Sequence, residues 1–180
     1  GKYIIIKDKN YDKEEIIRTC RKWLKTPYGL EKLEWVYQPI KRKIVIEKLL
    51  IDKEGKIPKD YKLHMFHEKC IFTLIIFGRM DSIGRIYFDK NWDILSFEGN
   101  VSSQDLKMEK PRNYKVMLKI AQKLSASFDL VRVDLYNLDG KIYFGELTHY
   151  PESGIRKYDP KYFDFELGKY WNLKTNCWES

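Results

Sequence analysis

The sequence predicts an α+β fold, in which a sheet domain with flanking helices follows a small lobe. β-type runs come close together between residues 61 and 147, and one amphipathic helix interrupts them. The segment 137–140, Asn-Leu-Asp-Gly, joins the last two runs, and Asp-Gly readily takes the positive φ of a hairpin turn. Because 43% of the 180 residues are hydrophobic, the chain can bury the core of one domain.

Residues 1–50 have the pattern of a small α/β lobe. Tyr3–Ile6 is a short β-type run, and Lys43–Glu47 is a second one. Between them, Asp12–Lys25 is predicted to be a helix, which the proline and glycine of Thr26–Gly29 end. Apolar side chains recur at helical spacing in this segment: Ile16, Ile17, Cys20, Trp23 and Leu24.

Residues 51–180 are predicted to form the larger domain, after the polar, turn-rich segment Asp52–Pro58. Its helix is expected over Tyr114–Ser125, where apolar residues again recur at helical spacing. The predicted strands are Tyr61–Phe66, Ile71–Phe77, Gly84–Phe88, Leu130–Tyr136 and Lys141–Leu147.

The charge and the cysteines limit the possible partners and compartment. A formal net charge of +8 favours anionic partners, which include nucleotide phosphates, nucleic acid and acidic polymers. The aromatic residues are spread without an RNA-binding motif, so we expect no nucleic-acid partner. Cys20, Cys70 and Cys177 form no metal-type pair, which indicates a reducing, cytoplasmic compartment. No apolar stretch approaches the roughly 20 residues of a membrane span.

The residues with the strongest chemical pattern lie in the hairpin. Strand alternation places Arg132 and Asp134 on one face, and Glu146 and Thr148 share a face on the returning strand. The hairpin can bring these faces together, where the two carboxylates would repel each other unless a cation lies between them. Oxygen ligands suit Mg²⁺, and Arg132 could stabilise charge on a transferred phosphoryl group.

A purely structural interpretation of the same residues remains open. Arg132 and Asp134 can be an ion pair on a solvated face, with Glu146 paired to a lysine. If instead both carboxylates hold the same metals, neutral amides at Asp134 or Glu146 should relieve their repulsion and leave the stability of the apo protein unchanged or raise it. His64, His67 and His149 are expected to be structural or solvated.

Arg-x-Asp followed by Glu-x-Thr resembles the metal motif of ATP-grasp enzymes. More specifically, segments 131–136, 144–148 and 151–154, with Leu167-Gly168, resemble the TupA-like ATP-grasp family, which is tied to teichuronopeptide and surface polysaccharide synthesis. The similarity runs from about Ile4 to Leu173. It implies an ATP-grasp fold, with residues 1–50 as a partial lid lobe and hinge and residues 51–180 as an antiparallel core lobe with the metal site.

The resemblance also implies roles for individual residues. Asp134 and Glu146 would be metal carboxylates, and Arg132 would be the catalytic cation. Thr148 would be a weaker third metal ligand, at the position where most ATP-grasp enzymes have Asn. Asp60 would bind ribose, although it can equally be a solvated residue beside a loop. The remaining nucleotide-binding residues would be Lys62, at phosphate or co-substrate, and the hinge residues Glu47, Lys48, Leu49 and Leu50, which can also be a plain strand end.

The implied activity is ATP- and Mg²⁺-dependent ligation of a carboxylate to an amine through an acyl phosphate, acting on a surface-polymer precursor. One alternative is a glycosyltransferase of capsular or exopolysaccharide synthesis, because the acidic pair suits the metal of a nucleotide-sugar as well. Another is a non-catalytic domain that binds an anionic polymer. The family's phosphate-loop lysine lies upstream of Tyr3–Ile6, so we expect an N-terminally truncated chain, and catalysis by this piece alone is doubtful.

Overall fold

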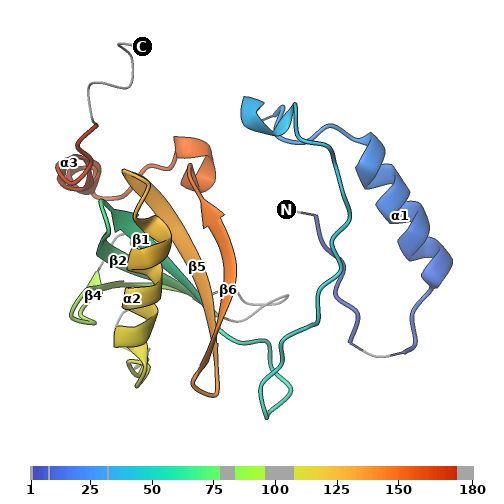
Figure 1. The fold of residues 1–180 in the computed structure, drawn as a ribbon, viewed down its shortest axis with the longest axis horizontal. Helices are drawn as coiled ribbons and strands as arrows, with labels where there is room; N and C mark the ends of the chain where they lie inside the picture. The colour runs from blue at the N-terminus through green and yellow to red at the C-terminus, as the bar shows by residue number, and fades with distance from the viewer. Residues whose placement is uncertain (1, 8, 32, 78–83, 96–107, 174–180) are drawn as a thin grey trace. The chain divides into compact units, whose positions relative to one another are not determined.

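The computed structural model describes residues 2–7, 9–31, 33–77, 84–95 and 108–173. The chain divides into two compact units, Gly1–Ile51 and Asp52–Ser180, which are described separately below (Figure 1). Cys20 and Cys70 are free thiols, and Cys177 lies outside the described residues. Among the described helices, none has the length and apolar character that a membrane span requires.

Unit 1 contains the helix α1 (Lys13–Lys25) and the short 3₁₀ helix η1 (Trp35–Tyr37). The predicted helix is confirmed. It begins at Asp12, whose side chain accepts hydrogen bonds from the backbone N–H of Glu14 at 2.9 Å and of Glu15 at 3.0 Å. These two bonds satisfy amides that a helix N-terminus otherwise leaves unpaired.

The two strands predicted in unit 1 are wrong. Neither Tyr3–Ile6 nor Lys43–Glu47 forms a strand in the structure, and Ile46 is 94% exposed. A β-type run becomes a strand only when a neighbouring strand pairs with its backbone, and the described part of unit 1 supplies no such ladder.

The described residues of unit 2 form a six-stranded sheet in the order β4-β3-β2-β1-β5-β6, in which each strand pairs antiparallel with its neighbour. The five predicted strands and the hairpin are confirmed. The sixth strand, β4, has two residues and is too short for an alternation pattern. The strands are β1 Asp60–Phe66, β2 Lys69–Phe77, β3 Gly84–Asp89, β4 Ile94–Leu95, β5 Leu130–Leu138 and β6 Lys141–Thr148.

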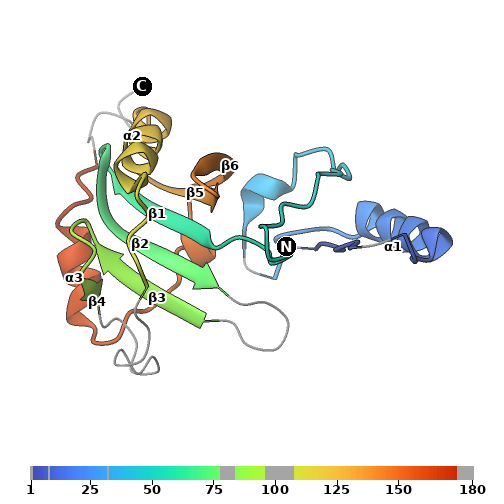
Figure 2. The ribbon, with the colours of Figure 1, turned by 90° about the horizontal axis from the view of Figure 1, so that it is seen from below.

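One face of the sheet packs against α2 (Tyr114–Ser125), which confirms the predicted helix. Its residues Tyr114, Met117 and Ala121 are buried because their spacing puts them on one side of the helix. They meet alternate strand residues such as Leu63 and Val133, so this layer holds the larger core. Figure 2 shows α2 along this side of the sheet.

The opposite face packs against the C-terminal segment, which contains the 3₁₀ helix η2 (Pro151–Gly154) and the helix α3 (Tyr162–Gly168). Phe163 and Leu167, one helical turn apart, pack against Phe72 and the rest of a small cluster on β2 and β3. The sequence prediction did not include α3, whose seven residues give only this one i,i+4 apolar pair as a signal. The part of this face over the middle of β1, β5 and β6 carries the polar residues Lys62, Arg132, Asp134, Glu146 and Thr148.

Candidate active site

Charged side chains form a row across the polar part of the sheet. In the strand register Lys62 of β1 lies opposite Asp134 of β5, and Asp134 lies opposite Glu146 of β6. The next row places Arg132 opposite Thr148. Residues that pair across neighbouring strands have their side chains on the same face of the sheet. The pairing of β1 with β5 and of β5 with β6 therefore brings together the predicted site residues of these three strands.

Arg132 is the centre of the cluster. Its Nε donates to Asp134 Oδ1 at 2.7 Å and its Nη2 donates to Asp134 Oδ2 at 2.8 Å, which is a bidentate pair. The same Nη2 also donates to Glu146 Oε1 and to Thr148 Oγ1, both at 3.0 Å. Two carboxylates and one hydroxyl therefore converge on a single guanidinium nitrogen.

Lys62 supplies a second cation from within the chain. Its Nζ donates to Asp134 Oδ2 and lies 2.9 Å from Asp60 Oδ2, so it bridges two carboxylates. The expectation that apo stability holds or rises when Asp134 is neutralised considered only the repulsion between the two carboxylates. Because Asp134 is held by both Lys62 and Arg132, it loses two ion pairs rather than a repulsive neighbour when it is neutralised.

The cluster changes from buried to exposed along the row. The side chain of Asp134 is 3% exposed, and that of Glu146 is 62% exposed. Burial raises the pKa of Asp60, and the charge of Lys62 offsets this rise only in part. Burial is the largest single effect and would lower the pKa of Arg132, but the hydrogen bonds to Asp134 and the charges of Asp134, Glu146 and Asp60 together outweigh it and raise that pKa. Arg132 therefore stays a permanent cation at the partly buried end.

His64 lies beside the charged row, opposite Arg132 in the register of β1 and β5. It is buried and stacks on Phe72 with ring centroids 4.0 Å apart. Burial, followed by the charge of Arg132, lowers the pKa of His64 to about 3. The imidazole is therefore neutral at pH 7 and takes the structural role that we expected from the sequence.

A β-bulge at Gly145 sets the register of the cluster. Asp134 pairs with Glu146 while Leu135 pairs with Phe144, so Gly145 is the extra residue on β6. A Cβ at this position would lie 3.0 Å from the backbone oxygen of Asp134, which leaves little room for any larger residue. The bulge keeps Glu146 and Thr148 on the face of Arg132.

A model of the family described as TupA-like ATPgrasp matches residues 1–172, nearly the whole chain. The chain belongs to the TupA-like ATP-grasp family. No curated protein and no solved structure matches it. The mixed helices and antiparallel sheet of unit 2 are consistent with this family, whose function is of the ATP-grasp type, an ATP-dependent, ligase-like chemistry that generally uses ATP and Mg²⁺.

The oxygen atoms around Arg132 suit the Mg²⁺ that ATP-grasp proteins generally use. Asp134 and Glu146 are carboxylates and Thr148 is a hydroxyl, and Mg²⁺ prefers such hard ligands together with phosphate oxygens and water. In the described residues, no group of three or more His, Cys, Asp or Glu side chains is placed to hold a metal ion.

The hinge residues that the ATP-grasp resemblance indicates lie in unit 1. Glu47 and Lys48 are exposed, while Leu49 and Leu50 are half-buried. None of the four belongs to a strand, so the alternative of a plain strand end is wrong. Their role with adenine stays a prediction.

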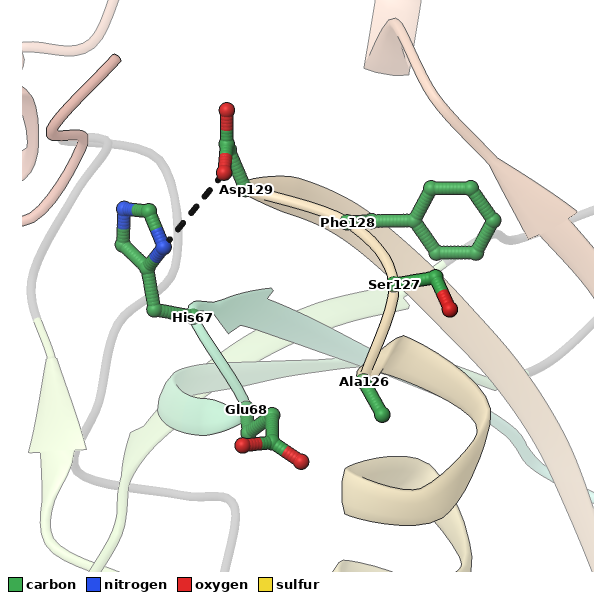
Figure 3. A pocket seen from close by; sticks show the side chains of 6 residues that line it. All are labelled: His67, Glu68, Ala126, Ser127, Phe128 and Asp129. Atoms are coloured by element: carbon green, nitrogen blue, oxygen red, sulfur yellow. Dashed lines mark ion pairs between the residues drawn. The ribbon is translucent and has the colours of Figure 1, made fainter. Parts of the chain in front are cut away.

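A small pocket lies away from the charged row of this ATP-grasp chain. It is formed by the turn between β1 and β2 and by the loop before β5 (Figure 3). His67 Nδ1 lies 3.5 Å from Asp129 Oδ1 across it. The charged row lies further along β1 and β5, so this pocket is separate from the candidate active site.

The sequence analysis missed a second polar cluster on the same face of the core sheet. Arg156 follows η2, donates to Tyr87 Oη at 2.6 Å and pairs with Glu152. Its guanidinium carbon lies 5.4 Å from the ring centroid of Tyr158, in cation–π range. The i,i+4 spacing of Glu152 and Arg156 was the only local signal, because Tyr87 is distant in sequence.

Proposed function

We propose that the protein is an ATP- and Mg²⁺-dependent ligase that joins a carboxylate to an amine. A carboxylate oxygen of one substrate attacks the γ-phosphorus of ATP, and ADP leaves as the β,γ-bridging bond breaks. An amine nitrogen then attacks the carbonyl carbon of the acyl phosphate, phosphate leaves with its bridging oxygen, and the nitrogen loses a proton. This chemistry depends mainly on positioning and on charge neutralisation.

The observation that carries this proposal is the convergence of Asp134, Glu146 and Thr148 on Arg132. Bound Mg²⁺ would neutralise the phosphate oxygens and hold them in line for attack. Asp134 and Glu146 would hold the metal, with Thr148 as a weaker third ligand. Arg132 would stabilise the negative charge that develops on the transferred phosphoryl group.

The neighbouring residues have supporting roles in the proposal. Lys62, only 12% exposed, would turn its ammonium toward a phosphate or the co-substrate while Asp60 holds its other side. Asp60 has a buried Oδ1 without a hydrogen-bond partner among the described residues, and a ribose hydroxyl would satisfy it. The backbone and apolar side chains of the segment 47–50 would contact adenine. The substrate would be a surface-polymer precursor, ligated in the cytoplasm.

Isothermal titration tests the proposal against its alternatives. The chain is titrated with ATP, with a nucleotide-sugar and with single-stranded RNA, each with and without Mg²⁺. We expect binding of ATP that Mg²⁺ strengthens. Tighter binding of the nucleotide-sugar would favour a glycosyltransferase, and metal-independent binding of RNA alone would favour an anionic-polymer binder, so either result would overturn the proposed ligase.

A further inference from the structure

Most of the net positive charge of the chain lies in unit 1. Residues 1–51 contain 13 Lys and Arg but only seven Asp and Glu, which gives a formal charge of +6 out of the +8 of the whole chain. This excess occupies 51 of 180 residues, so unit 1 presents a much more basic surface than unit 2. Such a concentration attracts an anionic partner.

The helix α1 combines this charge with an apolar stripe. Its apolar residues recur at the i, i+1, i+4, i+7, i+8 spacing of one helix face. None of them is buried, and Leu24 is 37% exposed. The stripe consists of Ile16, Ile17, Cys20, Trp23 and Leu24.

Charged side chains occupy the other side of α1, where the basic residues outnumber the two acidic ones, Glu14 and Glu15. At 100° per residue, four basic positions fall on the side away from the stripe, and all four are exposed. These residues are Arg18, Arg21, Lys22 and Lys25. The helix α2 differs, because its apolar residues Met117 and Ala121 are fully buried in the core of unit 2.

The described residues of unit 1 form no core that would bury the stripe. No described residue of unit 1 is buried, and its exposed apolar residues include Leu33, Trp35 and Ile46. Apolar side chains with Trp on one side, Lys and Arg on the other, and a helix too short to span a bilayer are the features of a helix that lies in a membrane interface.

We infer that α1 docks unit 1 on the surface of a membrane that contains anionic phospholipids. The helix lies parallel to the surface, with Trp23 and its apolar neighbours at the boundary between headgroups and acyl chains. Arg18, Arg21 and Lys22 reach the phosphate groups with their flexible stems. The inference concerns the place where the protein works, and it does not depend on the proposed ligase activity.

Sedimentation of the full chain with lipid vesicles tests this. We expect binding to vesicles of phosphatidylcholine with 30% phosphatidylglycerol and little binding to phosphatidylcholine alone. Raising the salt concentration from 50 mM to 500 mM should weaken the binding, because exposed charges are screened.

Two triple variants remove the same number of positive charges, one set from α1 and the other from α2. Comparing their binding shows whether it depends on the basic residues of α1 or only on the net charge of the chain. Arg18→Gln/Arg21→Gln/Lys22→Gln changes α1, and Lys115→Gln/Lys119→Gln/Lys123→Gln changes the exposed side of α2. A basic residue near an anionic surface contributes about fivefold to binding, so the α1 variant should partition on the order of a hundredfold more weakly. The α2 variant should bind as the parent does.

The apolar stripe has its own test and its own alternatives. Ile17→Ser/Leu24→Ser should reduce vesicle binding without changing the circular dichroism of the chain, because neither residue is buried. Absence of binding to anionic vesicles, or equal loss in both charge variants, would refute the inference. A dimer in sedimentation velocity that the Ser variant dissociates, without vesicle binding, would assign the stripe to a second copy instead.

Discussion

Asp134 is the residue on which the charged row depends. It accepts hydrogen bonds from both Arg132 and Lys62 while its side chain is only 3% exposed. We predict that Asp134→Asn lowers the free energy of unfolding by about 2–3 kcal/mol, because two partly buried cations each lose one of their two carboxylate partners. Urea unfolding measures this difference. The result would be the opposite of the stabilisation expected for two unscreened carboxylates.

Glu146 provides the matched control, because it is a carboxylate of the same cluster that is 62% exposed. Glu146→Gln should cost less than about 1 kcal/mol, as exposed ion pairs do. If the proposed function holds, both variants lose the increase in melting temperature that MgATP gives the parent. An MgATP shift that persists in both variants would remove the metal site from the proposal, whatever their apo stability.

His64 gives the stability a pH dependence. Its pKa is about 3 in the folded protein and about 6.5 when unfolded, so protons bind preferentially to the unfolded chain between these values. The contribution of neutral His64 to the free energy of unfolding is therefore complete above pH 6.5. As the pH falls below this value, the free energy of unfolding decreases by up to about 1.4 kcal/mol per pH unit. We predict that His64→Leu has a shallower loss of stability between pH 6 and 4, measured by urea unfolding. Equal slopes would show that His64 is protonated when folded.

At the scale of elements, the bulge at Gly145 connects the sheet to the site. We predict that Gly145→Ala costs about 1–3 kcal/mol, because the new methyl group meets the backbone of β5. Gly168→Ala is the control, since a Cβ there has no atom within 4 Å. Thermal unfolding compares the two variants. A Gly145→Ala variant as stable as the control would show that the bulge can relax.

The sequence predicted five strands and α2 of unit 2 because each has a strong period of its own, which the two-residue β4 and the short α3 lack. Alternation in β5 placed Arg132 and Asp134 on one face, and the Asp-Gly turn placed β6 beside them. The role of Lys62 was not predictable in this way. Its contact with Asp134 depends on the pairing of β1 with β5, and local patterns contain no information about that register.

Unit 1 shows the limit of local patterns. The runs Tyr3–Ile6 and Lys43–Glu47 have strand composition, yet neither forms a strand. The helix α1 was predictable because its hydrogen bonds close within the segment, with Asp12 as a cap. Strand formation depends on a partner elsewhere, so composition alone gave a wrong prediction.

At the scale of the whole molecule, the two units should differ in resistance to proteolysis. No described residue of unit 1 is buried, whereas unit 2 has a continuous core. We predict that trypsin cleaves after Lys53 or Lys56, in the exposed turn at the unit boundary, before it cleaves within β1 or β5. Mass spectrometry of a time course identifies the cuts. Early cleavage within β5 would contradict the prediction.

The distance in sequence between Lys62 and Asp134 has a consequence for biosynthesis. The two residues are 72 positions apart, and β5 pairs with the edge of β1 that β2 leaves open. At about 5–20 residues per second, a ribosome needs roughly 4–14 s to make the intervening chain. During that interval β1 can form its hairpin with β2, but its other edge has no partner strand and Lys62 has only Asp60 of its two carboxylate partners. A chain released early would therefore present an unpaired edge to other nascent chains, which is the usual start of aggregation.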